Sequence, residues 1–460
     1  MTQIRALTND PRRAALEVLE DVAQGAWLEN SLTKRTALLT GENLALARAL
    51  VYAVLRHQAR LDFLIKGKLK KGGASSALMA ILRLGLAQFL FFNRLGDHAI
   101  VYETVKLASD QSPGLKGLIN AILRGFAREK AKEGFIAEVD GRDTAPLDRL
   151  AVFYSHPRWL VDLFVSQLGL RETRSLLVAN NQLTPPTLRV NPKLISRREL
   201  AANLPFATKE TKYSPWGLRP LKWPGNPENW PGYAEGHFAI QDEASQILGL
   251  LVGQPKRVLD ACAGLGGKTL ALASSLAAET QLVALDPQES RLGHLLTEAK
   301  RQKAGQGINV VQGRIESVAL AALNQGPGAA DLEAAALFDL VIVDAPCSGL
   351  GVIRRRPDIK WRKTLSGLGP LAASQGRILQ AAAKLVAPGG RLIYSVCSVT
   401  EAEGPKVMEW FLKNTPNFGP LTDPTPPALA GLEVGVGQLR LWPQRDMTDG
   451  FFYGLLTRLA

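Results

Sequence analysis

The sequence predicts an all-α N-terminal domain followed by an α/β domain with a doubly wound, mostly parallel sheet. Two observations support this fold class. Apolar residues recur at helical spacing through residues 1–135. After residue 236, short apolar runs alternate with helical patterns, which is typical of a parallel sheet covered by helices. A chain of 460 residues is also too long for one core, so several domains are expected.

The helical part begins at Asp10-Pro11, where an N-cap residue precedes a proline in the first turn. The stretch 42–65 continues the apolar pattern, with arginines on its other face. Four more helices are predicted from the same spacing, over 76–93, 98–108, 114–128 and 155–169. The span 130–148 is charged and contains glycine, so it is expected to be a linker.

The charge balance indicates an anionic partner. The formal net charge is +13, and most of the excess lies before residue 236. A nucleic acid is therefore expected to bind, with the N-terminal half supplying much of the contact surface. A helical bundle with a solvated basic face is the plainer alternative. Trp216, Trp223 and Trp230 lie near cations, which suits base stacking, although hydrophobic anchoring explains these tryptophans at least as well.

These patterns divide the chain into three expected domains: a helical domain over 1–135, a small α/β linker or RNA-contact domain over 150–235, and a catalytic α/β domain over 236–460. The chain has three cysteines, too few for a disulfide framework, and their spacing fits no zinc site. A reducing cytoplasm is therefore the expected location. The most apolar run, 81–92, is too short and too charged to span a bilayer, so no membrane partner is expected.

The strands of the C-terminal domain are short β-branched runs. They are RVLDA (257–261), LVALD (282–286), NVVQG (309–313), DLVIVD (339–344) and RLIYSV (391–396). An Ala-rich insert at 324–337 precedes the fourth. Because parallel strands present their carboxyl ends at one edge of a sheet, residues that follow these strands are candidates for the functional site.

A glycine-rich turn follows the first of these strands, and a helical pattern follows the turn. Gly264, Gly266 and Gly267 allow a ligand to approach the backbone, and the helix that follows presents free N–H groups. Asp286 ends the second strand, where a carboxylate suits the hydroxyls of a ribose. The spacing before Lys268 is wrong for a Walker loop. A nucleoside-containing cofactor is expected, either a dinucleotide or S-adenosylmethionine.

Two cysteines follow two other strands. Asp344 ends the fourth strand and Cys347 comes three residues later, while Cys397 ends the fifth. Both thiols are expected to face one crevice, whereas Cys262 is more typical of a structural cysteine. The triplet 354–356 is all arginine, and cations beside Cys347 would favour its thiolate and attract phosphate. A thiolate can add to C6 of cytosine and make C5 nucleophilic toward a sulfonium methyl group.

The stretches DAPCSGLGVIRRRPDIKW and YSVCSV closely resemble the motifs of RNA cytosine-5 methyltransferases of the RsmB (Sun/Fmu) and NOP2 superfamily. The stretches GHFAIQDEASQ and DGFFYGLLTR are similar to its flanking motifs. HAIVYETVKLA and LKGLINAILRGFARE resemble the NusB-type RNA-binding domain. The resemblance implies a Rossmann-like class I methyltransferase domain that uses S-adenosylmethionine. It also implies methyl transfer to C5 of a specific cytosine in 16S rRNA or a small-subunit precursor, by a monomer.

The resemblance also implies roles for individual residues. Cys397 would be the nucleophile on C6, Cys347 would assist release of the methylated base, and Asp344 would contact cytosine near the methyl donor. Arg354, Arg355 and Arg356 would lie on the substrate side. The residues implied in cofactor binding are Cys262, Ala263, Gly264, Leu265, Gly266, Gly267, Lys268, Asp286, Arg314 and Asp344.

The chain departs from the family pattern in the cofactor region. Leu265 replaces a proline in the glycine turn, and Arg314 replaces an acid that Glu316 is a candidate to supply. Near the second thiol, Val396 replaces a threonine, and Gly404 replaces an asparagine after Glu403. The alternatives are a methyltransferase that acts on tRNA or another rRNA site, and a non-catalytic RNA-binding assembly factor. A nicotinamide dehydrogenase would leave the paired thiols unexplained.

Overall fold

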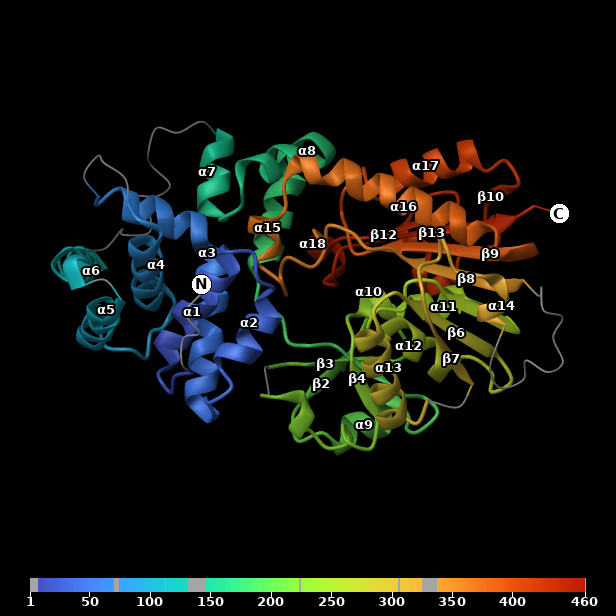
Figure 1. Ribbon diagram of the computed structural model, residues 1–460, viewed down its shortest axis with the longest axis horizontal. Helices are drawn as coiled ribbons and strands as arrows, with labels where there is room; N and C mark the ends of the chain where they lie inside the picture. Colours follow the sequence, from blue (N-terminus) through green and yellow to red (C-terminus); the bar gives the residue numbers. More distant parts are fainter. Residues whose placement is uncertain are drawn as a thin grey trace. The chain divides into compact units, whose positions relative to one another are not determined.

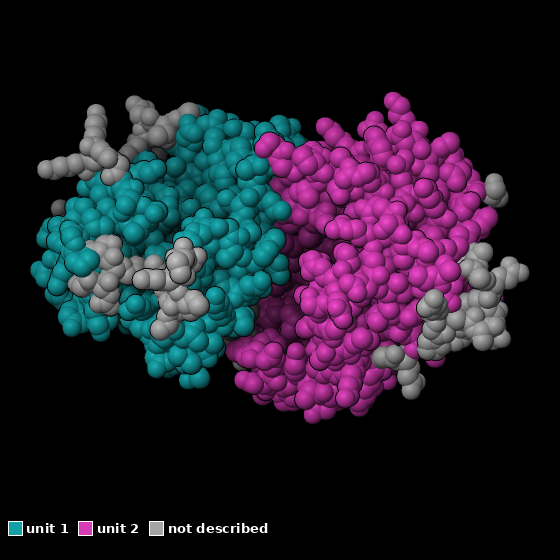
Figure 2. All heavy atoms as spheres, viewed as in Figure 1, with its two compact units in different colours: residues 1–181, 356–365 teal, residues 182–355, 366–460 magenta. Residues whose placement is uncertain are grey.

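The structure is a computed structural model that describes residues 7–69, 74–111, 113–130, 146–222, 225–304, 307–324 and 337–459. The chain forms two compact units, coloured separately in Figure 2. Unit 1 comprises residues 1–181 and 356–365, and unit 2 comprises 182–355 and 366–460. The three domain ranges expected from the sequence stay a prediction.

Unit 1 is built from helices (Figure 1). Its helices are α1 (Pro11–Ala23), α2 (Leu28–Arg35), α3 (Gly41–Lys66), α4 (Ser76–Phe91), α5 (Asp97–Gln111), α6 (Lys116–Lys130), α7 (Pro146–Phe153), α8 (Arg158–Asn181) and the short α15 (Ile359–Arg362). The Asp10 carboxylate caps α1 by accepting hydrogen bonds from the backbone N–H groups of Arg12 and Arg13. The predicted N-terminal helices are confirmed. Within the described part of the chain, none is long and apolar enough to cross a membrane.

The helix predicted over 155–169 has its expected break at Gly169. Gly169 has a φ of 73°, so its backbone is not helical. A second helical stretch follows directly and continues α8 to Asn181. The predicted linker lies mostly outside the described residues, since 131–145 are not described.

The segment 356–365 completes unit 1 although it lies far along the chain. The Trp361 indole N–H donates to the Leu55 carbonyl at 2.7 Å. The Lys360 ammonium is fully buried and donates to the carbonyl of Arg56 at 2.8 Å and to the Asn181 side chain at 3.3 Å. Unit 1 therefore contains a segment from the second half of the sequence, which packs against its N-terminal helices.

Unit 2 contains a small antiparallel sheet in the order β2-β3-β1-β4. Its strands are β1 (Leu188–Val190), β2 (Thr208–Glu210), β3 (Gly217–Pro220) and β4 (Phe238–Ile240), and helix α9 (Arg197–Asn203) packs beside them. Trp230 is buried in this core, as the anchoring interpretation predicted. Trp223 lies outside the described residues.

Unit 2 also contains a nine-stranded sheet in the order β11-β12-β13-β9-β8-β5-β6-β7, with β10 paired to β13. Its strands are β5 (Arg257–Asp260), β6 (Gln281–Asp286), β7 (Ile308–Gln312), β8 (Phe338–Asp344), β9 (Val386–Val396), β10 (Phe418–Pro420), β11 (Glu433–Gly435), β12 (Gln438–Leu441) and β13 (Phe451–Arg458). The run β9-β8-β5-β6-β7 is parallel, so the predicted doubly wound sheet is confirmed. Residues 325–336 of the Ala-rich insert are not described.

Helices cover both faces of this sheet, because alternate strand residues point to opposite sides (Figure 1). Val341 and Val343 of β8 pack with the helices of one face, and Leu340 and Ile342 pack with those of the other. The first face carries α14 (Leu320–Leu323), α16 (Leu368–Ala383) and α17 (Pro405–Asn414). The second carries α10 (Glu243–Gln246), α11 (Leu248–Leu251), α12 (Gly267–Ser275) and α13 (Glu289–Arg301). The short α18 (Pro443–Asp446) precedes β13.

The strand order places a topological switch point between β5 and β8. From β5 the chain moves to β6 and β7 on one side, and it then returns to β8 and β9 on the other. Ligands of doubly wound sheets bind beyond the carboxyl ends of the strands at such a point. The turns after β5 and β8 carry the two central motifs of the sequence, so a ligand-binding site is expected at this edge of the sheet.

Candidate active site

The glycine turn after β5 brings backbone close to a ligand site. Gly264 and Gly266 have φ values of 55° and 87°, a region that favours glycine. A Cβ atom on Gly266 would lie only 2.5 Å from Cγ of the buried Leu295. Gly266 is also the N-cap of α12, whose first N–H groups have no partner within the helix. The turn therefore needs glycine, and it leaves donors available for an anionic or polar ligand.

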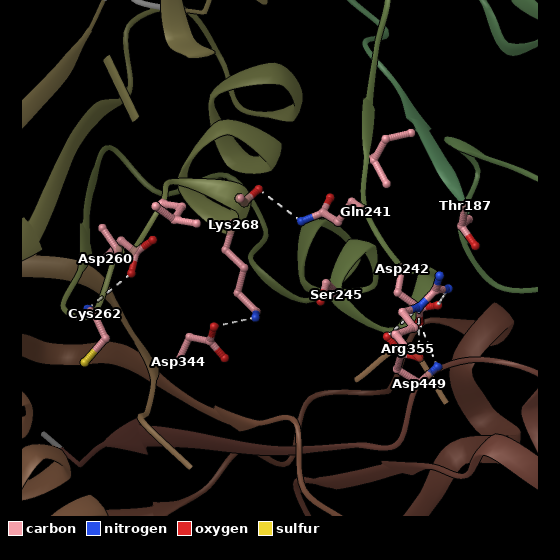
Figure 3. Close-up of a pocket in the computed structure, with 15 residues that line it drawn as sticks. Thr187, Gln241, Asp242, Ser245, Asp260, Cys262, Lys268, Asp344, Arg355 and Asp449 are labelled. Atoms are coloured by element: carbon pink, nitrogen blue, oxygen red, sulfur yellow. Dashed lines mark hydrogen bonds and ion pairs between the residues drawn. The ribbon is translucent and has the colours of Figure 1, made fainter. Parts of the chain in front are cut away.

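A cavity of about 430 Å³ lies beside this turn (Figure 3). Seven of the predicted cofactor residues line it: Cys262, Ala263, Gly264, Leu265, Gly267, Lys268 and Asp344. Gly266, Asp286 and Arg314 do not. The Asp286 carboxylate accepts hydrogen bonds from the backbone N–H groups of Gly264 at 3.0 Å and Gln288 at 2.8 Å. A carboxylate has about four acceptor positions, so Asp286 retains capacity for a ribose hydroxyl. Arg314 is exposed after β7.

Asp260 was missed in the sequence, although it lines the cavity at the end of β5. It accepts hydrogen bonds from the Thr269 hydroxyl at 2.7 Å and from the Cys262 backbone N–H at 3.3 Å. Burial, reinforced by the nearby Asp344 carboxylate, raises the pKa of Asp260 to about 6. Burial also raises the pKa of the Cys262 thiol well above its usual value, so this thiol keeps its proton at neutral pH.

Lys268 and Asp344 point toward each other from the two sides of the switch point (Figure 3). The Lys268 ammonium lies 2.6 Å from an oxygen of Asp344, and it also lies 4.7 Å from the centre of the Phe451 ring. The other oxygen of Asp344 accepts a hydrogen bond from the Ser395 hydroxyl at 2.9 Å. Asp344 is thus fixed by one contact from the cofactor turn and by one from β9.

The structure brings the two predicted thiols together. β8 and β9 are parallel neighbours, and the Sγ atoms of Cys347 and Cys397 lie 3.2 Å apart. The expectation that neighbouring arginines favour a Cys347 thiolate is wrong. The hydrogen bond with Cys397, together with burial, raises the pKa of the Cys347 thiol well above its usual value. Cys347 therefore holds its proton in the free enzyme.

Two of the three arginines are engaged elsewhere. Arg354 is buried and donates to Asp449 at 2.7 Å and to Asp242 at 2.9 Å. Arg355 donates to the same two carboxylates at 3.0 Å and 2.5 Å. Burial opposes ionisation of Asp242, but the two arginines outweigh it and lower the pKa of Asp242 to about 2. Arg355 also lines the cavity, whereas Arg356 is exposed at the start of the segment in unit 1.

Sequence reasoning missed the other cavity residues because they come from separate segments. The cavity is also lined by Thr187, Ile240, Gln241, Asp242, Ser245 and Asp449. Gln241, Asp242 and Ser245 lie in the GHFAIQDEASQ motif and Asp449 opens the DGFFYGLLTR motif, so the two flanking resemblances were usable signals. Thr187, at the start of the small sheet, carried no signal.

A doubly wound sheet with a glycine-rich turn and a crevice at the ends of β5 and β8 is typical of enzymes that bind a nucleoside-containing cofactor, and methyltransferases that use S-adenosylmethionine are one such class. A family model for the 16S rRNA methyltransferase RsmB/F matches residues 249–457, and one for the NusB family matches 9–128. A third, for the RsmF/B-like ferredoxin-like domain, matches 156–221.

Curated relatives match nearly the whole chain. Ribosomal RNA small subunit methyltransferase B of Vibrio cholerae is 32% identical, with 97% of each chain covered. The protein of that name from Pseudomonas putida is 34% identical, with 98% of this chain and 99% of the relative covered. The chain therefore belongs to the 16S rRNA methyltransferase RsmB/F family. It is an rRNA methyltransferase that uses S-adenosylmethionine.

Solved structures share the fold. The crystal structure of PH0851 has a TM-score of 0.75 at 23% identity, and the match covers 98% of this chain and 99% of that one. The NSun6 structure from Pyrococcus horikoshii has a TM-score of 0.54 at 18% identity, covering 66% of this chain and 98% of that one.

Proposed function

We propose that this methyltransferase methylates C5 of one cytosine in 16S rRNA through a covalent adduct between Cys397 and C6 of the base. The observation that carries the proposal is the 3.2 Å separation of the Cys347 and Cys397 sulfurs at the ends of β8 and β9. Cytosine C5 is a weak nucleophile until a group adds at C6, and a thiolate is well suited to that addition. Methylation of nitrogen or oxygen has no need for two thiols.

The two thiols take different roles in this proposal. Cys347 keeps its proton, so its S–H can donate to the Cys397 sulfur. Cys397, which accepts that hydrogen bond, is assigned as the nucleophile on C6. Asp344, held by Lys268 and Ser395, is assigned to support the ring at N3. The cofactor supplies an electrophilic methyl group to C5. Release requires transfer of the C5 proton to a base and expulsion of the Cys397 sulfur as a thiolate. Cys347 is assigned to assist this step, for which it must first give up the proton that it holds in the free enzyme.

The residues present fit S-adenosylmethionine. The cavity combines the turn Cys262–Lys268, in which glycine permits close approach, with buried Asp260 and the free N–H groups of α12. We assign Cys262 to Lys268 to the methionine and ribose side and Asp286 to the ribose hydroxyls. We also assign Arg314 to the cofactor, although its side chain is exposed and does not line the cavity.

The RNA substrate follows from the family and from charge. The relatives from Vibrio cholerae and Pseudomonas putida carry names that specify the small ribosomal subunit. The chain carries a net charge of +13, which suits an RNA backbone. Arg355, at the edge of the cavity, and exposed Arg356 are assigned to the substrate side.

Incubation with labelled methyl donor and unmodified 16S rRNA tests the reaction. We expect label at one cytosine, and bisulfite sequencing identifies 5-methylcytosine because that base resists conversion. Unmodified tRNA serves as the competing substrate. Label in tRNA alone would support the alternative substrate class, and no incorporation at any cofactor concentration would support a non-catalytic assembly factor instead.

Two cysteine variants test the covalent step. Cys397→Ser should lose methyl transfer by about 10⁴-fold or more and form no adduct, because it lacks the nucleophile. Cys347→Ser should accumulate a protein–RNA adduct that survives denaturing electrophoresis, because release is impaired. An adduct in Cys397→Ser, with normal turnover in Cys347→Ser, would reverse the two assignments.

A further inference from the structure

A buried carboxylate accepts hydrogen bonds from the turns that carry both cysteines. Glu403 is fully buried, and one of its oxygens accepts hydrogen bonds from the Ser398 hydroxyl at 2.7 Å and the Ser348 hydroxyl at 2.5 Å. Its other oxygen accepts from the Ser348 backbone N–H at 2.7 Å. Ser348 follows Cys347 in the chain, and Ser398 follows Cys397. A single side chain therefore bridges the residues next to the two thiols.

Two further residues complete this arrangement. The Gln375 amide donates to Glu403 at 3.1 Å and to the Pro346 carbonyl at 3.0 Å. The Tyr394 hydroxyl donates to the Glu403 carbonyl at 2.6 Å. The turn around Cys347 is thus held on both sides, at Pro346 by Gln375 and at Ser348 by Glu403.

The contacts of Glu403 are hydroxyl and amide groups. Within the described part of the chain, no lysine or arginine lies in salt-bridge distance of its carboxylate. A buried carboxylate without a cation is costly unless hydrogen bonds satisfy it, and an apolar side chain would fill a core at lower cost. Packing alone would not require a carboxylate at this position. Its donors, however, belong to Ser348 and Ser398, which follow the two cysteines, so the carboxylate can hold the two cysteine turns together.

We propose that Glu403 is a positioning residue that sets the separation of Cys347 and Cys397. The inference rests on the proposed function for its consequence in catalysis, because addition and release need both sulfurs within reach of one base. When one of the two carboxylate oxygens is lost, either the Ser348 backbone N–H or the two serine hydroxyls lose an acceptor, and the connection between the two turns weakens. The thiols would then sample larger separations, and misplacement of about 1 Å in a reacting group can cost about 100-fold in rate.

The test uses the full-length chain with Glu403→Gln, which keeps the size of the side chain and replaces one acceptor oxygen by a donor. Glu409→Gln is the matched control, because Glu409 lies in α17, shortly after Glu403 in the chain, and is exposed. Phenylarsine oxide, which binds two neighbouring thiols together, reports on their separation without any methyl transfer. Cys347→Ser identifies the captured pair, since it leaves only one of the two thiols.

We expect wild type and Glu409→Gln to capture the arsenical equally at Cys347 and Cys397. Glu403→Gln should capture it about 100-fold more slowly and lose a similar factor in kcat, with KM for RNA and cofactor little changed. Capture and kcat like those of wild type would overturn the inference, as would a loss confined to KM. If Glu403→Gln does not fold, Ser398→Ala replaces it, because this variant removes one bridging hydroxyl and keeps the carboxylate. Slower capture and lower kcat in Ser398→Ala would support the inference, and values like those of wild type would overturn it.

The two proposals fail separately in this experiment. If wild type captures the arsenical and Glu403→Gln does not, but neither methylates cytosine, the proposed function is wrong and the positioning role of Glu403 stands. If wild type methylates cytosine and Glu403→Gln does so equally well, the positioning role is wrong and the proposed function stands.

Discussion

Gly266 shows how one residue shapes the cofactor turn. Its φ of 87° lies in the left-handed region, and Leu295 of α13 occupies the space that a side chain would need. Leu295 thus packs directly against the residue that forms the N-cap of α12. The conformation of the turn thus depends on the absence of a single methyl group.

Gly266→Ala should therefore destabilise unit 2 by about 1–3 kcal/mol, because both the clash and the φ strain must be relieved. Affinity for S-adenosylmethionine should fall as the turn shifts. Gly293→Ala on the exposed face of α13 is the control, where nothing lies within 4 Å of the added Cβ. It should be neutral or more stable by about 0.5–1 kcal/mol. Denaturant unfolding and calorimetric titration with the cofactor measure both effects, and equal behaviour of the two variants would refute the packing argument.

Residue identities were predictable where a short motif carried them. The pairing of Cys347 with Cys397 followed from two strand ends in one sheet, and seven of ten cofactor residues line the cavity. The pKa of Cys347 was not predictable, because it depends on which atoms face the thiol. The arginines are adjacent in sequence, yet two of them form ion pairs with Asp242 and Asp449, far away in the chain.

At the scale of elements, that buried ion cluster joins three segments of unit 2. Asp242 precedes α10, Arg354 and Arg355 follow the Cys347 turn, and Asp449 precedes β13. The Asp449 backbone N–H also donates to Asp242 at 2.8 Å. The cluster therefore fixes three chain segments at one end of the cavity.

Asp449→Ala should cost about 3–5 kcal/mol of stability in unit 2, because it removes one of the two carboxylates that pair with the buried Arg354. Asp423→Ala is the control: Asp423 pairs with Arg391 at the surface, where an ion pair contributes about 0–1 kcal/mol. Urea unfolding of both variants gives the comparison. A cost for Asp449→Ala no larger than that for Asp423→Ala would show that the cluster does not hold these segments.

Elements were predictable where the hydrophobic period was strong. The β-branched runs gave the five parallel strands, because burial on both faces of a sheet demands continuous apolar residues. The C-terminal hairpin strands β11 and β12 were not identified, since β11 is only three exposed residues long. The break at Gly169 was predictable from the glycine, but the second helical stretch of α8 that follows it was not identified.

At the scale of the molecule, each unit has its own buried titrating groups. In unit 1, burial lowers the pKa of His57 to about 3, and the nearby Lys360, Arg56 and Arg60 add to the shift. Burial likewise lowers the pKa of His156 well below its usual value. Below the ordinary pKa of 6.5 the unfolded chain binds protons that the folded unit excludes, so stability falls as the pH drops from about 6.5 toward 3.

Replacing His57 by phenylalanine should flatten this dependence, because Phe keeps the stack on Phe91 and cannot titrate. Below pH 6.5, wild type should lose up to about 1.4 kcal/mol per pH unit relative to His57→Phe. Hydrogen–deuterium exchange of α3 amides, compared between the two proteins at each pH, provides the measurement. Parallel stability curves for the two proteins would contradict a neutral buried His57.

The division into a helical part and a parallel α/β part was predictable for the whole molecule, since each has its own period. The membership of residues 356–365 in unit 1 was not. In sequence they continue the catalytic motif without a break, and only tertiary contacts such as Trp361 with Leu55 assign them to the helices.

That membership has a consequence for synthesis on the ribosome. The helices of residues 7–181 emerge first. The hydrogen-bond donors for the carbonyl groups of Leu55 and Arg56 are Trp361 and Lys360, which are synthesised much later. At about 5–20 residues per second, the chain must lengthen through the whole of residues 182–355 of unit 2 before those partners exist. The N-terminal helices thus finish folding late in translation, after the Cys347 turn has been made.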